Sequence, residues 1–293
     1  MPLSKRRKVI LGAIFVAAST AGFFWYAVWQ ENTARRSGIL TLAFMDVGQG
    51  DAIFVEAPNG NQMIIDGGPN AAILRELGNL MPFYDRTIDV LVITNPDTDH
   101  YAGFLDVLER YEVAMVIESG VRSDTTTYAA FERAVAAEGA DKVIAKRGMN
   151  LVLDPENGAN FEIIFPDQDV SSGFSSNDGS IVARLVYGNT SIMFTGDTTQ
   201  KVEKRLLRTE ATPLKSDILK AAHHGSKTSS FKDFVAAVSP AHAVISVGRN
   251  NRYKHPSPET LETLTALKVP VLRTDKMGTI IFESDGKVLK RRR

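Results

Sequence analysis

The chain has 293 residues, 44% of them hydrophobic and 23% charged, so it can bury one large core or two modest ones. Its 34 basic and 34 acidic residues give a formal net charge of zero, which excludes a chain-wide electrostatic field that would attract nucleic acid or acidic lipid. Cysteine is absent, which excludes disulfide frameworks and thiolate metal sites and leaves imidazole, carboxylate and amide groups as metal ligands.

The N-terminal segment predicts a membrane anchor. Residues 1–8 end in a basic cluster, and residues 9–29 carry no charge, which is close to the roughly 20 residues that a helix needs to cross a bilayer. Aromatic residues gather at the far end of this run, as they do at membrane interfaces. Because basic flanks stay in the cytoplasm, we expect a single-pass cell-membrane protein whose remaining chain is extracytoplasmic. A cleaved signal peptide is the alternative, since residues 17–21 are rich in small side chains.

A polar linker at residues 30–38 precedes one predicted domain, residues 39–293. Short apolar runs bounded by Gly, Asp and Asn predict strands, and apolar residues at helical spacing predict helices. The expected strands are residues 40–45, 52–56, 62–65, 90–94, 113–117, 142–145, 150–153, 161–165, 181–187, 191–195, 218–222, 243–247, 271–273 and 279–283, and the expected helices are residues 70–79, 101–111, 127–138, 200–208, 230–238 and 258–267. Helices spaced to cover two sheets predict an α/β fold, a four-layer αβ/βα sandwich, which is followed by a short basic tail.

The most informative segment follows the predicted strand Val90–Thr94. Its uncharged sequence is typical of a strand buried on both faces. The loop after it presents Asn95, Asp97, Asp99 and His100 within six residues. Such a position, outside the carboxyl end of a strand, is where α/β proteins place their sites. A solvated loop in which one aspartate only caps the following helix is the alternative.

Two further predicted strands also end in potential ligands. Residues 191–195 are followed by Asp197, and residues 218–222 by His223 and His224. A fourth histidine near a predicted element end, His255, precedes a helix, whereas His242 has the position of an ordinary packed side chain. Carboxylates and imidazoles concentrated at strand ends are typical of a metal site.

Seven short motifs resemble, in their order, the metallo-β-lactamase-like domain of ComEC-type competence proteins. They are Asp46-Val-Gly-Gln-Gly-Asp51, Asp66-Gly-Gly68, Thr94 to His100, Asn177-Asp-Gly-Ser180, Thr195-Gly-Asp197, His223-His-Gly-Ser226 and His255-Pro, and they span nearly all of residues 40–285. The resemblance implies an αββα fold, a metal-dependent hydrolase and a phosphodiester substrate such as DNA. In that family the domain accompanies a multi-span channel module, in place of which we expect a single anchor here.

The chain departs from the superfamily motif His-x-His-x-Asp-His, because it has Asn95-Pro-Asp-Thr-Asp-His100. The resemblance implies a first metal site of Asn95, Asp97 and Asn177, and a second of Asp99, His100, Asp197 and one of His223 and His224. An amide oxygen is a neutral, weak donor, so the first site should be weak or empty and should prefer Mn²⁺ or Mg²⁺ to Zn²⁺. We therefore expect one firmly held divalent metal, Zn²⁺ or Mn²⁺.

The implied mechanism is metal-assisted hydrolysis, in which a metal-bound water is the nucleophile. Asp99 takes part as a ligand, while Asp66 and Asp51, in Gly-rich turns, would orient ligands or water. His255 would donate a proton to the leaving group. The alternatives are ordinary turn chemistry for Asp66 and Asp51 and a structural position before a helix for His255.

Three functions compete at this point. The first is an extracytoplasmic phosphodiesterase or nuclease, for which basic residues near the motifs could hold phosphates. These residues are Lys227, Lys232, Arg249, Arg252 and Lys254. The second is hydrolysis of another ester or amide, of which a β-lactam is disfavoured because Asn95 weakens the first site. The third is a binding or scaffold module that keeps the fold without catalysis.

Overall fold

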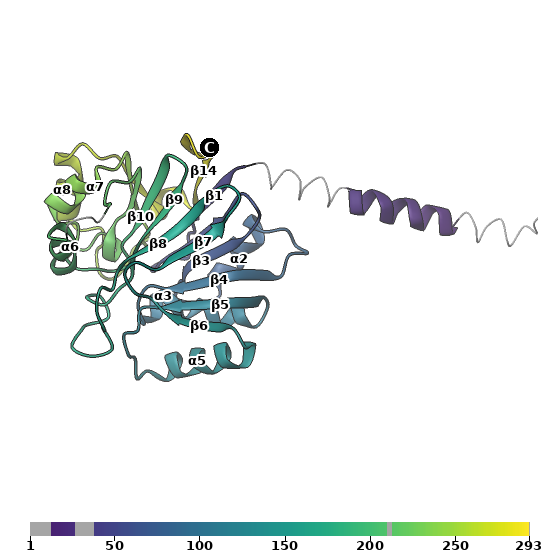
Figure 1. The fold of residues 1–293 in the computed structure, drawn as a ribbon, viewed down its shortest axis with the longest axis horizontal. Coiled ribbons are helices and arrows are strands. Elements are labelled where there is room, and N and C mark those ends of the chain that lie inside the picture. Colours follow the sequence, from purple (N-terminus) through teal and green to yellow (C-terminus); the bar gives the residue numbers. More distant parts are fainter. Residues whose placement is uncertain (1–12, 27–37, 210–212, 293) are drawn as a thin grey trace, which may run out of the picture.

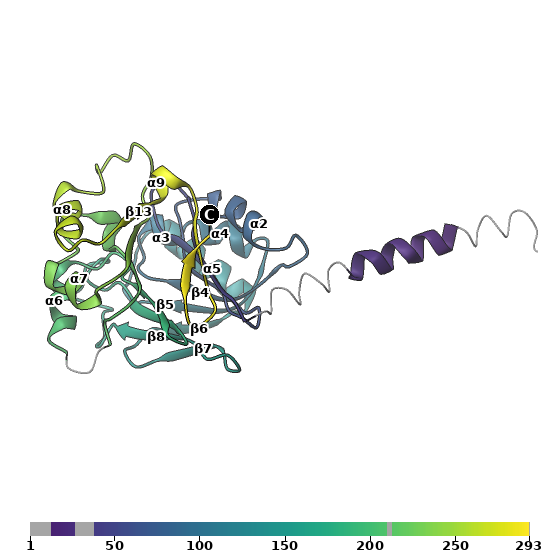
Figure 2. The same ribbon diagram turned by 90° about the horizontal axis from the view of Figure 1, so that it is seen from above.

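The computed structural model describes residues 13–26, 38–209 and 213–292. From residue 38 onward two β-sheets face each other, and helices cover their outer sides (Figures 1 and 2). This arrangement is the four-layer αβ/βα sandwich that the sequence predicts.

The first sheet has eight strands within the described residues, in the order β15-β14-β1-β2-β3-β4-β5-β6. They are β1 (Leu40–Phe44), β2 (Ala52–Glu56), β3 (Gln62–Gly67), β4 (Thr87–Ile93), β5 (Glu112–Glu118), β6 (Asp141–Ile144), β14 (Ile280–Ser284) and β15 (Leu289–Arg291). The helices on its outer face are α2 (Ala72–Leu80), α3 (Thr98–Tyr101), α4 (Gly103–Leu108) and α5 (Thr126–Glu138).

The second sheet has seven strands within the same described ranges, in the order β13-β12-β11-β10-β9-β8-β7. They are β7 (Asn150–Asp154), β8 (Ala159–Phe165), β9 (Val182–Tyr187), β10 (Thr190–Phe194), β11 (Ile218–Lys220), β12 (His242–Ile245) and β13 (Val271–Arg273). Helices α6 (Gln200–Leu207), α7 (Lys232–Val238) and α8 (Pro258–Ala266) cover it, and α9 (Thr274–Met277) follows β13.

Three apolar clusters hold the four layers together. Phe44 and Phe161 belong to the cluster between the sheets. Phe104 belongs to the cluster under the helices of the first sheet, and Phe234 to the one under those of the second. Side chains alternate between the two faces of a strand, so each central strand can supply both its inner and its outer cluster.

The parallel parts of the two sheets bring the candidate residues to one edge. In the first sheet β3, β4 and β5 are parallel neighbours, and in the second β10, β11 and β12 are. Their carboxyl ends carry Asp66, the loop Thr94–His100, Asp197 and the pair His223–His224. The fold therefore gathers residues that lie far apart in the sequence.

Most predicted elements are confirmed, with differences at their ends, but three are wrong in detail. The helix expected at residues 101–111 begins at Thr98 and is divided into α3 and α4. Gly103 lies at this junction because a Cβ there would be 2.1 Å from the carbonyl oxygen of Gly67. The strand expected to reach residue 222 ends at Lys220, and a 3₁₀ turn follows it. Part of the supposed basic tail is β15, an edge strand of the first sheet.

The N-terminal helix projects from the domain (Figure 1). Residues 13–26 are helical and exposed. No helix in the described part of the chain is both long and apolar enough to cross a membrane. The predicted anchor, residues 9–29, extends beyond the described helix at both ends, and the basic residues 1–8 and most of the linker 30–38 also lie outside the described residues. These segment boundaries stay predictions.

Candidate metal centre

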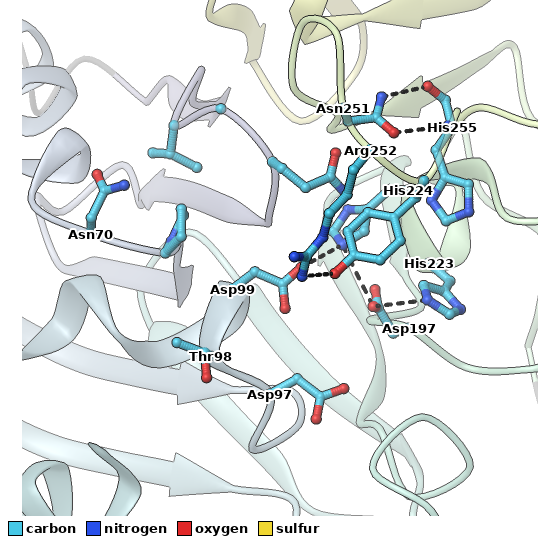
Figure 3. A pocket seen from close by; sticks show the side chains of 15 residues that line it. Asn70, Asp97, Thr98, Asp99, Asp197, His223, His224, Asn251, Arg252 and His255 are labelled. Atoms are coloured by element: carbon cyan, nitrogen blue, oxygen red, sulfur yellow. Dashed lines mark hydrogen bonds and ion pairs between the residues drawn. The ribbon is translucent and has the colours of Figure 1, made fainter. Parts of the chain in front are cut away.

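A cavity of about 780 Å³ opens at the shared edge of the two sheets (Figure 3). The charged and polar side chains that line it include Asp97, Asp99, Asp197, His223, His224 and His255. All six belong to the candidate site predicted from the sequence. Loops that follow strands of both sheets therefore surround this one cavity.

His100 is fully buried next to Asp197, which lines this cavity. Its Nδ1 is 2.7 Å from Oδ2 of Asp66, and its Nε2 is 3.1 Å from Oδ2 of Asp197. The backbone N–H and the hydroxyl of Thr94 donate to the same Asp66 carboxylate at 2.8 and 2.7 Å. Asp66 is thus fixed by Thr94 and in turn fixes the His100 ring, which leaves Nε2 directed at Asp197. A carboxylate behind an imidazole is the usual support of a metal-binding histidine.

His224 approaches the same carboxylate from the second sheet. Its Nδ1 donates to the carbonyl oxygen of Ser246 at 3.0 Å, while its Nε2 lies 3.3 Å from Oδ2 of Asp99 and 3.5 Å from Oδ2 of Asp197. The Nε2 of His223 is 3.9 Å from the same Asp197 oxygen, and that side chain is partly exposed. His224 is therefore the inner and His223 the outer imidazole.

A left-handed turn makes both histidines available. His223 and His224 have φ values of 50° and 52°, and Gly225 follows with φ 81°. Consecutive residues in this conformation are uncommon outside glycine. Gly225 cannot be replaced easily, because a Cβ there would lie 2.6 Å from Cβ of Pro256. The turn after β11 is therefore built for the position of these two rings.

The site carries excess negative charge that favours a bound cation. Burial alone would lower the pKa of His100, but Asp197 and Asp66 outweigh it and raise that pKa well above the usual value. The pKa of His224 is likewise raised to about 10 against the effect of burial, chiefly by Asp197 and Asp51. Carboxylates that stabilise imidazolium cations so strongly would also stabilise a divalent metal in their place.

Two groups of side chains have the spacing of metal ligands. Asp99, His100 and His224 form one, and Asp51, His100 and Asp197 form the other, with the ligand atoms of each group within 4.8 Å of one another. Nε2 of His100, Nε2 of His224 and Oδ1 of Asp197 are buried and make no well-aligned hydrogen bond within the described residues. Buried polar atoms of this kind need a partner, and imidazole and carboxylate groups suit a divalent metal. The residues present therefore fit a metal ion.

Behind the site lies a buried cation that the sequence analysis missed. Lys220, at the end of β11, is 1% exposed and forms an ion pair with Asp51. Its Nζ donates to the carbonyl oxygen of Gly196 at 2.9 Å and lies 3.7 Å from Oδ1 of Asp197. Burial would raise the pKa of Asp51, but Lys220 and the neighbouring histidines lower it to about 2. The available signal was a single lysine within an apolar strand that ends in candidate ligands.

The residues expected to form the first metal site have the following contacts in the structure. Asn95 is buried, and its Oδ1 accepts the N–H of Asp97 at 2.9 Å while its amide donates to Oγ of Ser180 at 3.3 Å. Asp97 lines the cavity and accepts a hydrogen bond from Ser176 at 2.9 Å. Oδ1 of Asn177 is buried and has no hydrogen-bond partner within the described residues. Asn95 and Ser176 thus contact Asp97, whereas the second-site residues converge on Asp197.

The rim loop that follows Gly248 carries His255. Asn251 holds this loop, since its amide donates to the carbonyl of His255 at 2.8 Å and its Oδ1 accepts the His255 N–H at 2.9 Å. The rings of His255 and His223 are 5.6 Å apart, and Tyr253 stacks on His255 at 5.8 Å. Arg252 lies over the Tyr253 ring and lines the cavity beside Asp99 (Figure 3). An aromatic and basic rim thus borders the ligand cluster.

The support that Asp66 gives His100 leads to a prediction. We expect Asp66→Asn to lower metal affinity and any hydrolytic rate by about 10- to 100-fold, the usual cost of losing a carboxylate behind a metal-binding histidine. Metal titration followed by isothermal calorimetry measures the effect. Asp89→Asn is the matched control, because Asp89 also accepts a backbone N–H, from Gln62 at 2.7 Å, but at the opposite edge of the sheet. Equal losses in both variants would contradict a positioning role for Asp66.

Comparison with known proteins adds the family. The model of the Metallo-beta-lactamase superfamily matches residues 45–249. The chain is 32% identical over 266 residues to ComE operon protein 3 of Bacillus subtilis (strain 168), which covers 83% of this chain and 33% of that protein. It is 30% identical over 262 residues to competence protein ComA of Neisseria gonorrhoeae, covering 89% of this chain and 34% of that protein. The chain therefore spans about a third of the length of these curated relatives.

Among solved structures, the chain is similar to CmlA, a diiron beta-hydroxylase from Streptomyces venezuelae. The TM-score is 0.52 at 14% sequence identity, over 80% of this chain and 52% of that chain. At this identity the likeness concerns the fold alone.

Proposed function

The chain belongs to the metallo-beta-lactamase superfamily, and we propose that it is a metal-dependent phosphodiesterase or nuclease on the extracytoplasmic side of a membrane. The observation that carries the hydrolase proposal is the convergence of Asp99, His100, His224 and Asp197. Within the described residues, Nε2 of both histidines and Oδ1 of Asp197 have no well-aligned hydrogen-bond partner. A site of this composition supports hydrolysis by a metal-bound water.

In the proposed mechanism Asp99, His100, Asp197 and His224 would hold the metal, and His223 lies farther out. When bound, a divalent metal acidifies a coordinated water and neutralises charge on a phosphoryl oxygen. Asp66 holds the His100 ring in its orientation through the 2.7 Å contact at Nδ1. Lys220 balances the charge of Asp51 and keeps that carboxylate at the rear of the site.

For His255 we propose a different proton role from the one expected from the sequence. Burial, together with the charges of His223 and His224, lowers its pKa. Its ring is therefore neutral at neutral pH, and a neutral imidazole accepts a proton more readily than it donates one. We propose that His255 accepts a proton or orients water at the cavity rim.

The phosphodiester assignment rests on the rim and on the relatives. Arg252 offers a guanidinium beside Asp99, and guanidinium groups bind phosphates in a bidentate geometry. Relatives named as competence proteins support DNA as the substrate. The loop role of Asn95 disfavours a second firm metal, so we propose one firm site and one weak site. Hydrolysis of another ester or amide, or binding without catalysis, would be the outcome if phosphodiesters are not cleaved.

The N-terminal segment is proposed to be the membrane anchor. Its support is the uncharged run of residues 9–29 after a basic cluster, of which residues 13–26 are helical and exposed. The positive-inside rule then places the domain on the extracytoplasmic side.

The test is metal-dependent cleavage by the full chain in detergent. We expect hydrolysis of bis(p-nitrophenyl) phosphate and of a single-stranded oligonucleotide, with activation by roughly millimolar Mn²⁺ and less by Zn²⁺, since carboxylate and amide ligands favour the harder ion. EDTA should abolish the activity. Arg252→Ala should raise KM several-fold, while Lys232→Ala should leave it unchanged, because Lys232 on α7, unlike Arg252, is not among the residues that line the cavity. Bound metal without phosphodiester cleavage would indicate another bond, and protein that binds no metal would indicate a scaffold.

A further inference from the structure

The cavity and the N-terminus of the domain lie at opposite ends of the strands of the first sheet. The strand register pairs Thr41 with Glu56 and Glu56 with Gln62, so the chain enters β1 at the edge where β2 ends and β3 begins. The opposite edge, where β3 and β4 end, carries Asp66 and the loop of His100. The segment that precedes residue 38 is therefore attached far from the cavity.

An exposed aromatic loop lies at the end of the first sheet where the chain enters β1, opposite the cavity. Residues 81–86 join α2 to β4, and Oδ2 of Asp85 accepts a hydrogen bond from the Gln62 amide at 2.7 Å. Phe83 is 72% exposed, more than any other large hydrophobic side chain described between residues 38 and 292. The loop is held in shape, because both the N–H and the hydroxyl of Thr87 donate to Asp85. The fixed loop therefore presents a largely exposed aromatic ring on this side of the domain.

This loop also approaches the N-terminal helix. In both ribbon views the loop between α2 and β4 points toward the helix of residues 13–26 (Figures 1 and 2). The rings of Phe24 and Phe83 are 6.4 Å apart, and Phe83 is in edge contact with Tyr84 at 5.4 Å. Phe24 in turn contacts Trp25, which is 68% exposed. Aromatic side chains grouped at the end of an apolar segment are typical of the membrane interface.

We propose that the loop of residues 81–86 inserts Phe83 into the interfacial layer of the bilayer that holds the N-terminal segment, so that the domain stands on this edge and its cavity opens away from the membrane. The proposal rests on the membrane anchor proposed above. Four adjacent strands, β1 to β4, separate the two attachment points by only about 14 Å. The linker of residues 30–38 can span roughly 30 Å when extended, so both contacts can form together.

The test places single tryptophan reporters in the full chain in phosphatidylcholine vesicles. Trp25→Phe and Trp29→Phe remove both native tryptophans, and Phe83→Trp or Tyr253→Trp is then added. Tyr253 is the matched control, because it is an exposed aromatic residue at the cavity rim, 51% exposed. We expect lipids labelled near the headgroup to quench the reporter at position 83 at least about twofold more than lipids labelled deep in the chains, and to leave the reporter at position 253 unquenched.

The native tryptophans Trp25 and Trp29 test the membrane anchor separately from the insertion of the loop of residues 81–86. If Trp25 and Trp29 of the otherwise unaltered chain are quenched but the reporter at position 83 is not, the anchor holds and the loop insertion is overturned. If no position is quenched, the anchor fails and the insertion fails with it. Equal quenching at positions 83 and 253 would overturn the orientation. Metal content and circular dichroism of each variant show that the domain has kept its fold.

Discussion

Replacing His100 or Asp197 by alanine should remove the firmly bound metal and reduce hydrolysis to the background rate. Both side chains are buried, and they face each other with Nε2 and Oδ2 3.1 Å apart. No other imidazole in the described residues can take the place of His100, because only its Nδ1 is bound by Asp66. Loss of a direct ligand should cost more than the 10- to 100-fold associated with residues behind the ligands, so we expect metal affinity to fall by more than about 100-fold.

Elemental analysis of purified protein and metal-titrated hydrolysis measure this result. His242→Ala is the matched control, since His242 is a half-buried histidine of β12 whose ring packs near Phe282 at 6.3 Å, away from the cavity. That variant should keep its metal and its activity. If His100→Ala retains one metal per chain, the ion is held elsewhere, and the site proposed around Asp197 is wrong.

Much of this site could be predicted from the sequence because strand periodicity predicts where strands end. The bounds of β2 and β13 match the prediction, and neighbouring parallel strands share an edge by geometry. Asp99, His100 and Asp197 could therefore be expected to lie together before the fold was known. The polar loop after β4 carried most of this information.

Other features depend on contacts between distant segments, which periodicity does not contain. The deeper position of His224 relative to His223 follows from two left-handed residues and from the carbonyl of Ser246. The division of the helix at Gly103 follows from the approach of Gly67. The contacts of Asn95 are of the same kind, since its Oδ1 accepts the Asp97 N–H and its amide group donates to Ser180, 85 residues further along the chain. Each of these features is determined by a contact with a residue that is distant in the sequence.

Lys220 is the clearest example, and its replacement should have a large effect on stability. We expect Lys220→Met to lower the free energy of unfolding of the metal-free protein by about 3–5 kcal/mol, the cost of breaking a buried ion pair by removing one partner. The reason is that Asp51 is 1% exposed and Lys220 is its only cationic lysine partner in the described residues. Urea unfolding in EDTA at pH 7 measures the loss. Lys215→Met, at an exposed lysine before β11, is the control and should change stability little.

The pH dependence provides an independent check on the same pair. In the wild type the pKa of Asp51 is lowered to about 2, so its contribution is complete above the unfolded value near 4 and is lost as the pH falls toward 2. Without Lys220, only His224 and His100 oppose the effect of burial on Asp51. We therefore expect the pKa of Asp51 in the folded variant to rise above that of the unfolded chain, so that the folded variant binds a proton that the unfolded chain releases. The stability deficit of Lys220→Met should therefore narrow as the pH is lowered from 7 toward 5.

A second substitution decides whether the loss comes from the unpaired carboxylate. Lys220→Met combined with Asp51→Asn removes the buried charge, and we expect the double variant to recover about 2 kcal/mol or more of the loss in Lys220→Met at pH 7. Recovery of that size would indicate that Lys220 serves mainly to balance Asp51 and keep it from the metal ligands. If the double variant is as unstable as Lys220→Met and its deficit does not change with pH, the lysine acts through its bond to the Gly196 carbonyl and through packing instead.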